Sequence, residues 1–241
     1  IAGEISDTGE GLQLANNAAG TITFSGASKK FTTGNYNAVT LLNNSGSEIN
    51  FINGGLDITT TGGSGFTAAG GGALNVTGTD NSITTGTGTA VKLENSDIGS
   101  GDVLFDAITT GTTAASAVEI NNVSGGTFYG GDTQVAGTLS DSAITIENSS
   151  VAVNFKSIDL DNIGGAGITI NNSGPLTISG GSIYNTASYG VNSINSSLHL
   201  DSVNFGGSNG IGNAAIAITA DNAAPTSFTV SNSLIENIHG K

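Results

Sequence analysis

Short runs along the chain alternate apolar and polar residues and end in asparagine, as in AITIENS from residue 143 and GITINNS from residue 167. Two apolar residues stand two positions apart in each run, as Ile144 and Ile146 do, and this spacing is typical of a β-strand with one buried face. Related runs begin at residues 11, 38, 65, 90, 117, 190 and 215, so the pattern recurs every 23–27 residues. The sequence therefore predicts nine repeats of one strand-forming unit.

Each repeat contains two further strand-like segments. A second apolar pair follows a short turn, for example Val153 and Phe155, and a third apolar position comes shortly afterwards, for example Ile158. The fifth repeat, around Phe128 and Val135, fits least well. No unit can bury its apolar face alone, so neighbours must stack. We predict an all-β fold, a right-handed parallel β-helix of about nine coils with three strands per coil.

Asparagine stands two residues after the first apolar pair in most repeats. Because its amide both donates and accepts hydrogen bonds, stacked copies can form a ladder, and the period of two places them on the same face as the apolar pair. We therefore predict an inward Asn ladder. Its members are Asn16, Asn43, Asn95, Asn122, Asn148, Asn172 and Asn195.

The repeats fill almost the whole chain. We expect a single β-helix domain over residues 1–241, with residues 1–10 as an N-terminal lead-in or cap and residues 11–241 as the coils. The first residue is Ile1 rather than Met and no signal peptide is recognisable, so we expect a piece of a longer protein. No run approaches the roughly 20 apolar residues of a membrane span, and we expect none in this segment.

The composition of the chain excludes some classes of binding partner. The chain has 19 acidic and five basic residues, a formal net charge of −14, and all of its basic residues are lysines. Nucleic-acid binding needs a basic face, so we expect no nucleic-acid partner. The absence of cysteine excludes disulfides and thiolate metal sites. We expect no cofactor, leaving open a cation such as calcium and the identity of any metal.

The stretch GITINNSGPLTISGGSIYN, residues 167–185, resembles the coil repeat of the pectin-lyase-like superfamily of right-handed β-helices, and the resemblance covers about residues 11–240. The low-charge texture, rich in Gly, Asn, Ser and Thr and free of Cys, looks most like the passenger domains of bacterial autotransporters and large surface adhesins. The resemblance implies the fold. It implies function less narrowly, because that fold carries lyases, hydrolases, esterases, phage tailspikes and adhesins.

Enzymes of that superfamily act on polysaccharides with Asp or Glu together with Arg or Lys, and this chain has no Arg. We therefore assign no catalytic residue. The candidate ligand contacts are two pairs. Asp159 and Asp161 stand two apart, which places their carboxylates on one outward face about 7 Å apart, as a glycosidase pair, a calcium site or solvated surface. Tyr184 and Tyr189 offer rings to a glycan or pack over the coil end.

Charged residues also align between neighbouring coils. Lys92 and Glu119 occupy equivalent outward positions and predict an ion pair across the coils. Glu94, Asn121 and Glu147 form the next outward column, which suits a cation, a sugar hydroxyl or plain solvent.

These observations favour a protein that presents its polar surface to host or neighbouring surfaces. We expect a non-enzymatic bacterial adhesin or passenger β-helix, extracellular or on the cell surface, that attaches to a host-surface or extracellular polysaccharide or associates with itself. The alternative is a β-helix that binds or degrades polysaccharide, as a lyase or hydrolase.

Overall fold

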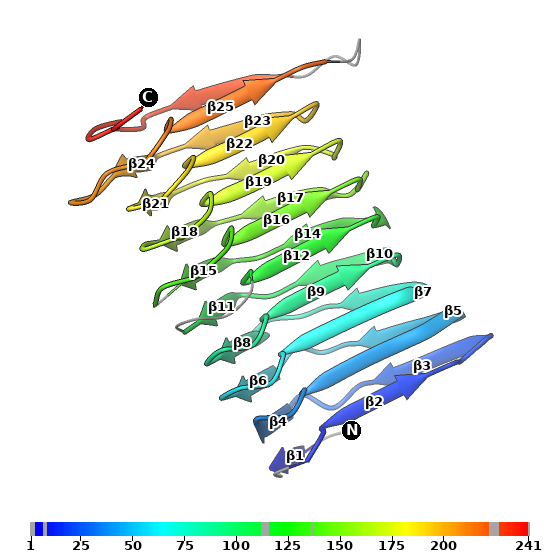
Figure 1. Cartoon of the computed structure of the whole chain (residues 1–241). Coiled ribbons are helices and arrows are strands. Elements are labelled where there is room, and N and C mark those ends of the chain that lie inside the picture. Colours follow the sequence, from blue (N-terminus) through cyan, green and yellow to red (C-terminus); the bar gives the residue numbers. More distant parts are fainter. Residues whose placement is uncertain (1–2, 7–8, 112–115, 136, 222–226, 241) are drawn as a thin grey trace.

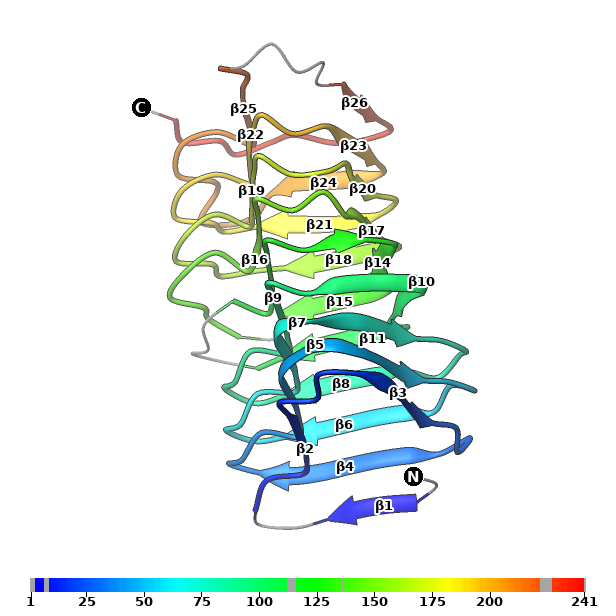
Figure 2. The same ribbon diagram turned by 90° about the vertical axis from the view of Figure 1, so that its right-hand side faces the viewer.

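The computed structural model describes residues 3–6, 9–111, 116–135, 137–221 and 227–240. All secondary structure in these segments is β, and every strand pairing is parallel. The strands stack in columns along one axis, so that each coil lies on the one before it (Figure 1). The view in Figure 2, turned by 90°, shows the coils following one another from the N-terminal end at the bottom to the C-terminal end at the top. The predicted parallel β-solenoid is confirmed.

Three columns of strands form the walls. The first column contains β2 (Leu12–Ala15), the first part of β5 (Val39–Phe51), the first part of β7 (Phe66–Val76), β9 (Val91–Glu94), β12 (Val118–Asn121), β16 (Ile144–Glu147), β19 (Ile168–Asn171), β22 (Val191–Ile194) and β25 (Ile216–Thr219). Nine segments lie in this column, so the described chain completes about eight turns between β2 and β25.

The second column contains β3 (Gly20–Phe24), the later parts of β5 and β7, β10 (Asp97–Leu104), β13 (Ser124–Gly125), β14 (Thr127–Tyr129), β17 (Ala152–Phe155), β20 (Leu176–Ile178), β23 (Leu198–Asp201) and β26 (Phe228–Ser231). The third column contains β1 (Gly3–Ser6), β4 (Lys29–Gly34), β6 (Leu56–Thr60), β8 (Ser82–Thr85), β11 (Ala107–Thr110), β15 (Asp132–Val135), β18 (Ser157–Leu160), β21 (Gly181–Tyr184) and β24 (Val203–Gly206). Strand β1 lies within the predicted lead-in and pairs with β4.

The apolar residues of the alternating pattern, from which the strands were predicted, point into one continuous core. Ile144 and Ile146 of β16 are fully buried and pair with Ile168 and Ile170 of β19. Phenylalanines extend along the axis in contact, with neighbouring ring centroids 4.7–6.4 Å apart. The stack consists of Phe24, Phe51, Phe66, Phe105, Phe128 and Phe155. Offset and edge-on aromatic pairs stabilise such a core beyond their buried area.

The fifth repeat departs from the pattern through one polar residue. Phe128 stacks between Val103 and Val153 as its neighbours require. In the third column, however, Thr133 takes the buried position that Ile108 and Ile158 hold in adjacent coils. The Thr133 hydroxyl donates to the carbonyl of Gly130 at 2.8 Å, so this polar group is satisfied inside. The repeat therefore belongs to the solenoid despite its weak apolar pattern.

The predicted asparagine ladder is present, but it lies on the outside of the coils. The seven named asparagines stack, with Asn122 donating to Asn95 at 2.7 Å and Asn195 donating to Asn172 at 3.0 Å. They face outward, however, and all except the half-buried Asn195 are exposed. The φ angles of the seven are 47–62°, the left-handed region that Asn tolerates. This conformation turns the chain and interrupts the period of two, so the prediction of their direction was wrong.

A polar ladder does line the inside in most coils, formed by the residue after the outer asparagine, and the apolar Val123 interrupts it. Asn44 is fully buried and accepts a bond from the Asn17 amide at 2.7 Å. In later coils serine takes this position: the Ser149 hydroxyl accepts from the backbone N–H of Val123 at 3.0 Å and donates to the carbonyl of Glu147 at 2.7 Å. These bonds satisfy backbone groups where the chain turns, which a buried turn requires.

Candidate functional site

The two predicted acidic residues, Asp159 and Asp161, accept hydrogen bonds from different partners and form no shared site. Asp159 lies exposed on the outer face of β18, where it accepts bonds from the hydroxyl of Ser182 at 3.0 Å and the amide of Gln134 at 3.5 Å. Asp161 follows the strand and accepts from the amide of Asn185 at 2.6 Å. Each carboxylate thus joins its own coil to a neighbouring one. Within the described ranges, no three acidic or histidine side chains converge as metal ligands.

The two predicted tyrosines are half-buried and lie on different parts of the coil. Tyr184 ends β21 and pairs with Gly206. Tyr189 lies in the turn before β22, where its carbonyl accepts the backbone N–H of Gly167 at 2.9 Å. Neither tyrosine lines the two depressions described below.

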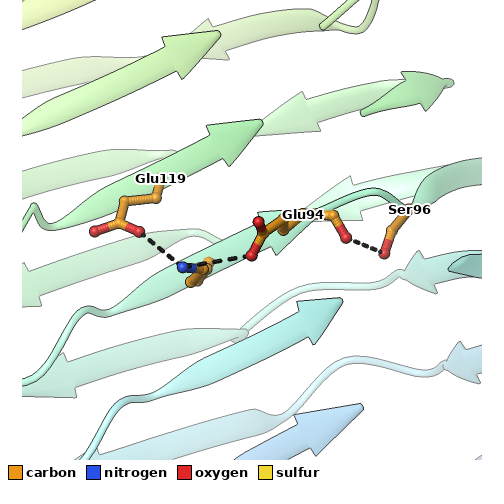
Figure 3. Close-up of polar contacts among 4 residues, drawn as sticks. Glu94, Ser96 and Glu119 are labelled. Atoms are coloured by element: carbon orange, nitrogen blue, oxygen red, sulfur yellow. Dashed lines mark hydrogen bonds and ion pairs between the residues drawn. The ribbon is translucent and has the colours of Figure 1, made fainter. Parts of the chain in front are cut away.

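The predicted ion pair between Lys92 and Glu119 is confirmed. The Lys92 ammonium lies 3.5 Å from a carboxylate oxygen of Glu119 and 3.5 Å from one of Glu94, a contact within the strand that the sequence analysis missed (Figure 3). A depression of about 220 Å³ opens here and includes Asp141 and Glu147. Because the three paired side chains are part exposed, each ion pair contributes roughly 0–1 kcal/mol. One ammonium among several carboxylates leaves this face acidic.

A larger depression lies on the outer face of the second column. Tyr129 ends β14 and points outward, because Phe128 before it fills the core. Leu104 of the preceding coil and Asn154 of the next coil pair with Tyr129, and Thr177 continues the same outward row. These residues line a depression of about 470 Å³, which we call the Tyr129 groove.

Charged side chains line the edge of the Tyr129 groove where the chain turns into the third column. The ammonium of Lys156 donates to the carboxylate of Asp132 at 2.8 Å, and Asp106 lies in the same groove. That hydrogen bond, followed by the charge of Asp132 and a smaller effect of Asp106, raises the pKa of Lys156 above its usual value. Two carboxylates and one ammonium therefore lie beside the exposed tyrosine ring.

The groove has a rigid base. Beneath it the rings of Phe105, Phe128 and Phe155 stack with centroids 6.4 and 6.2 Å apart. Gly131 has a φ of 53°, and a Cβ at this position would lie 2.2 Å from the carbonyl oxygen of Asp106. Only glycine therefore permits the close turn that carries Asp132 to the groove edge.

Tyr129 was not among the predicted site residues, although the sequence contains a signal for it. In the segment TFYGGD, residues 127–132, a period of two places Tyr129 outward once Phe128 is taken as a core residue. The weak third strand of this repeat concealed the register between coils. Tyr129 is 36% exposed, with apolar, amide and hydroxyl neighbours in register above and below it. Aromatic faces joined to a few directed polar groups are typical of ligand sites.

The fold and the grooves define a parallel β-solenoid that carries polar ladders and one aromatic groove on its surface. No protein-family model, no curated protein and no solved structure matched the chain when each was searched. Across the described part of the chain, the structure has no helix long and apolar enough to cross a membrane.

Proposed function

We propose that this protein is an extracellular or cell-surface bacterial attachment protein that holds a glycan in the Tyr129 groove without cleaving it. The observation that carries the proposal is the exposed Tyr129 ring, held in register with Leu104, Asn154 and Thr177 over a stacked core. A sugar ring has apolar C–H faces and a rim of hydroxyls. The tyrosine and leucine suit the faces, and the amide and hydroxyl suit the rim.

The sequence adds support for a surface role. The texture resembles autotransporter passengers and large adhesins, and the coil repeat resembles the pectin-lyase-like superfamily. A rigid solenoid suits display, because each coil is fixed by the coils on either side. In the proposed mechanism the protein presents the groove on a stiff stack and gains avidity when several copies meet one polymer.

The test is a labelled panel of host-type and extracellular polysaccharides, in which retention and chain length are read together. We expect retention of at least one polymer at full length. Tyr129→Ala should weaken retention roughly two- to tenfold, as loss of a stacking aromatic contact does. Tyr36→Ala is the matched control, since Tyr36 is 50% exposed and lies outside the groove.

Other outcomes would replace the proposal. Shortened chains would mean a lyase or hydrolase. Equal retention by both variants would place the glycan elsewhere on the surface. No retention, together with a sedimentation coefficient that rises with protein concentration, would favour self-association as the function.

A further inference from the structure

Each lysine of the described chain already lies close to an oxygen partner within the protein. The Lys29 side chain is 1% exposed, and its ammonium donates to the carbonyls of Gly26, Ile52 and Gly54. Lys30 lies 4.0 Å from Asp57. The remaining two, in the two depressions, already face the carboxylates described above.

The Tyr129 groove itself has an excess of negative charge. Asp106 and Asp132 line it against the single ammonium of Lys156. The Lys156 side chain is 76% exposed, so it can turn away from Asp132 without leaving a buried charge behind. The backbone N–H of Asn81 binds one oxygen of Asp106 at 3.1 Å and fixes that carboxylate at the edge.

The whole molecule adds to this local excess. With a formal net charge of −14, the surface potential repels polyanions and attracts cations. A uronate or sulfated polymer would have to displace an existing lysine–carboxylate pair and approach against this field. A ligand with ammonium groups is attracted by this field, and when it displaces Lys156 it leaves the carboxylate of Asp132 paired with a new ammonium.

We propose that the Tyr129 groove binds a glycan that carries free amino groups, with a sugar ammonium between Asp106 and Asp132 and the sugar ring against Tyr129. This inference rests on the proposed function and names its ligand class. The ammonium takes the place of Lys156 at Asp132 in a charge-assisted hydrogen bond, and an aromatic ring close to a cation adds to the attraction. Asn154 and Thr177 receive the neighbouring hydroxyls. These two polar groups, beyond the acidic edge, favour a glycan over a basic peptide.

The test compares four hexameric probes by calorimetry: a glucosamine oligomer, its N-acetylated form, a galacturonate oligomer and hexalysine. We expect the glucosamine oligomer to bind at least about tenfold more tightly than the N-acetylated one, the difference made by a charge-assisted bond. Binding of galacturonate and hexalysine should be weaker than either. Raising the salt concentration should weaken glucosamine binding and leave N-acetylglucosamine binding unchanged.

Variants separate this inference from the proposed function. Asp106→Asn and Asp132→Asn should each lower glucosamine affinity roughly two- to fivefold and leave the N-acetylated affinity unchanged. Asp57→Asn is the matched control, because it also breaks a lysine–aspartate pair, on another coil.

Three results would overturn the inference. If both sugars bind equally and both depend on Tyr129, the glycan function stands and the preference for amines is wrong. If hexalysine binds as tightly as glucosamine, the groove recognises basic peptides instead. If galacturonate binds best, the charge argument fails.

Discussion

Thr186 provides a direct test of how this solenoid is stabilised. Its side chain is 2% exposed and its hydroxyl oxygen is buried without a hydrogen-bond partner. Thr186 pairs with Ile163 of the preceding coil. In the next coil the backbone N–H of Gly212, which follows the buried Ile211, donates to the Thr186 carbonyl at 2.9 Å. The hydroxyl therefore lies in an otherwise apolar column of the core, where an unsatisfied polar group costs roughly 1–3 kcal/mol.

Replacing Thr186 with valine removes this hydroxyl and keeps the branched shape. We expect the free energy of unfolding to rise by about 1 kcal/mol, which corresponds to a rise of roughly 2–4 °C in Tm for a chain of this size. Thr133→Val is the matched control. Thr133 is also 2% exposed, but its hydroxyl donates to the Gly130 carbonyl, so this change should lower stability by about 1 kcal/mol.

The assay is urea unfolding of both variants and the parent protein, followed by circular dichroism, with a thermal scan on the same samples. Opposite shifts of the two midpoints are the expected result. If Thr186→Val lowers the midpoint as much as Thr133→Val does, the Thr186 hydroxyl has a partner, such as bound water, and the reasoning is wrong. Unchanged slopes in the transitions show that the comparison concerns stability alone.

Three further predictions concern the ladder, the core and acid stability. Asn122→Ala should cost about 1–2 kcal/mol in urea unfolding and Asn122→Gly clearly less, because φ is 53° there and glycine adopts it freely. Phe105→Ala should cost about 3–5 kcal/mol in the same assay, because it removes a fully buried ring from the aromatic stack. Bonds from Ser231 and then Asn232 lower the pKa of Asp201 below its usual value of 3.8, so its contribution is present above that pH and lost as pH falls through the folded pKa. The stability difference between the parent and Asp201→Asn, measured from pH 6 downward, should shrink below pH 4; a constant difference would contradict this.

The fold was predictable because every coil repeats the same physical solution. Ile144 and Ile146 stand two apart, and the same spacing returns in the next coil at Ile168 and Ile170, which indicates both a strand and its neighbour. Pairing of Lys92 with Glu119 followed from the same alignment. Local alternation and a fixed repeat length were sufficient for these features.

The ladder direction could not be read from alternation alone. Asn122 stands two residues after Ile120, so a continuous strand would turn it inward. Its left-handed backbone ends that continuity, and Val123 points inward instead. Likewise β18 ends at Leu160, so Asp161 lies beyond the strand and takes its own partner in the next coil. A period of two holds only while the backbone stays extended.

The candidate groove was missed for a related reason, which bears on where function arises in this fold. In regular coils the outer asparagines bond to their own copies, as Asn122 does to Asn95 and Asn195 to Asn172, and such a row offers little that is specific. Tyr129 stands in the least regular repeat, where Thr133 replaces an apolar residue inside and Gly131 tightens the turn. Residues that break a repeat gain nothing from stacking with identical neighbours, so a role outside the coil is the better explanation for them. The same argument applies to Lys92, which lies between Thr67 and Glu119 and is the one lysine in its row. Its surroundings are the second place on this surface to test for a ligand.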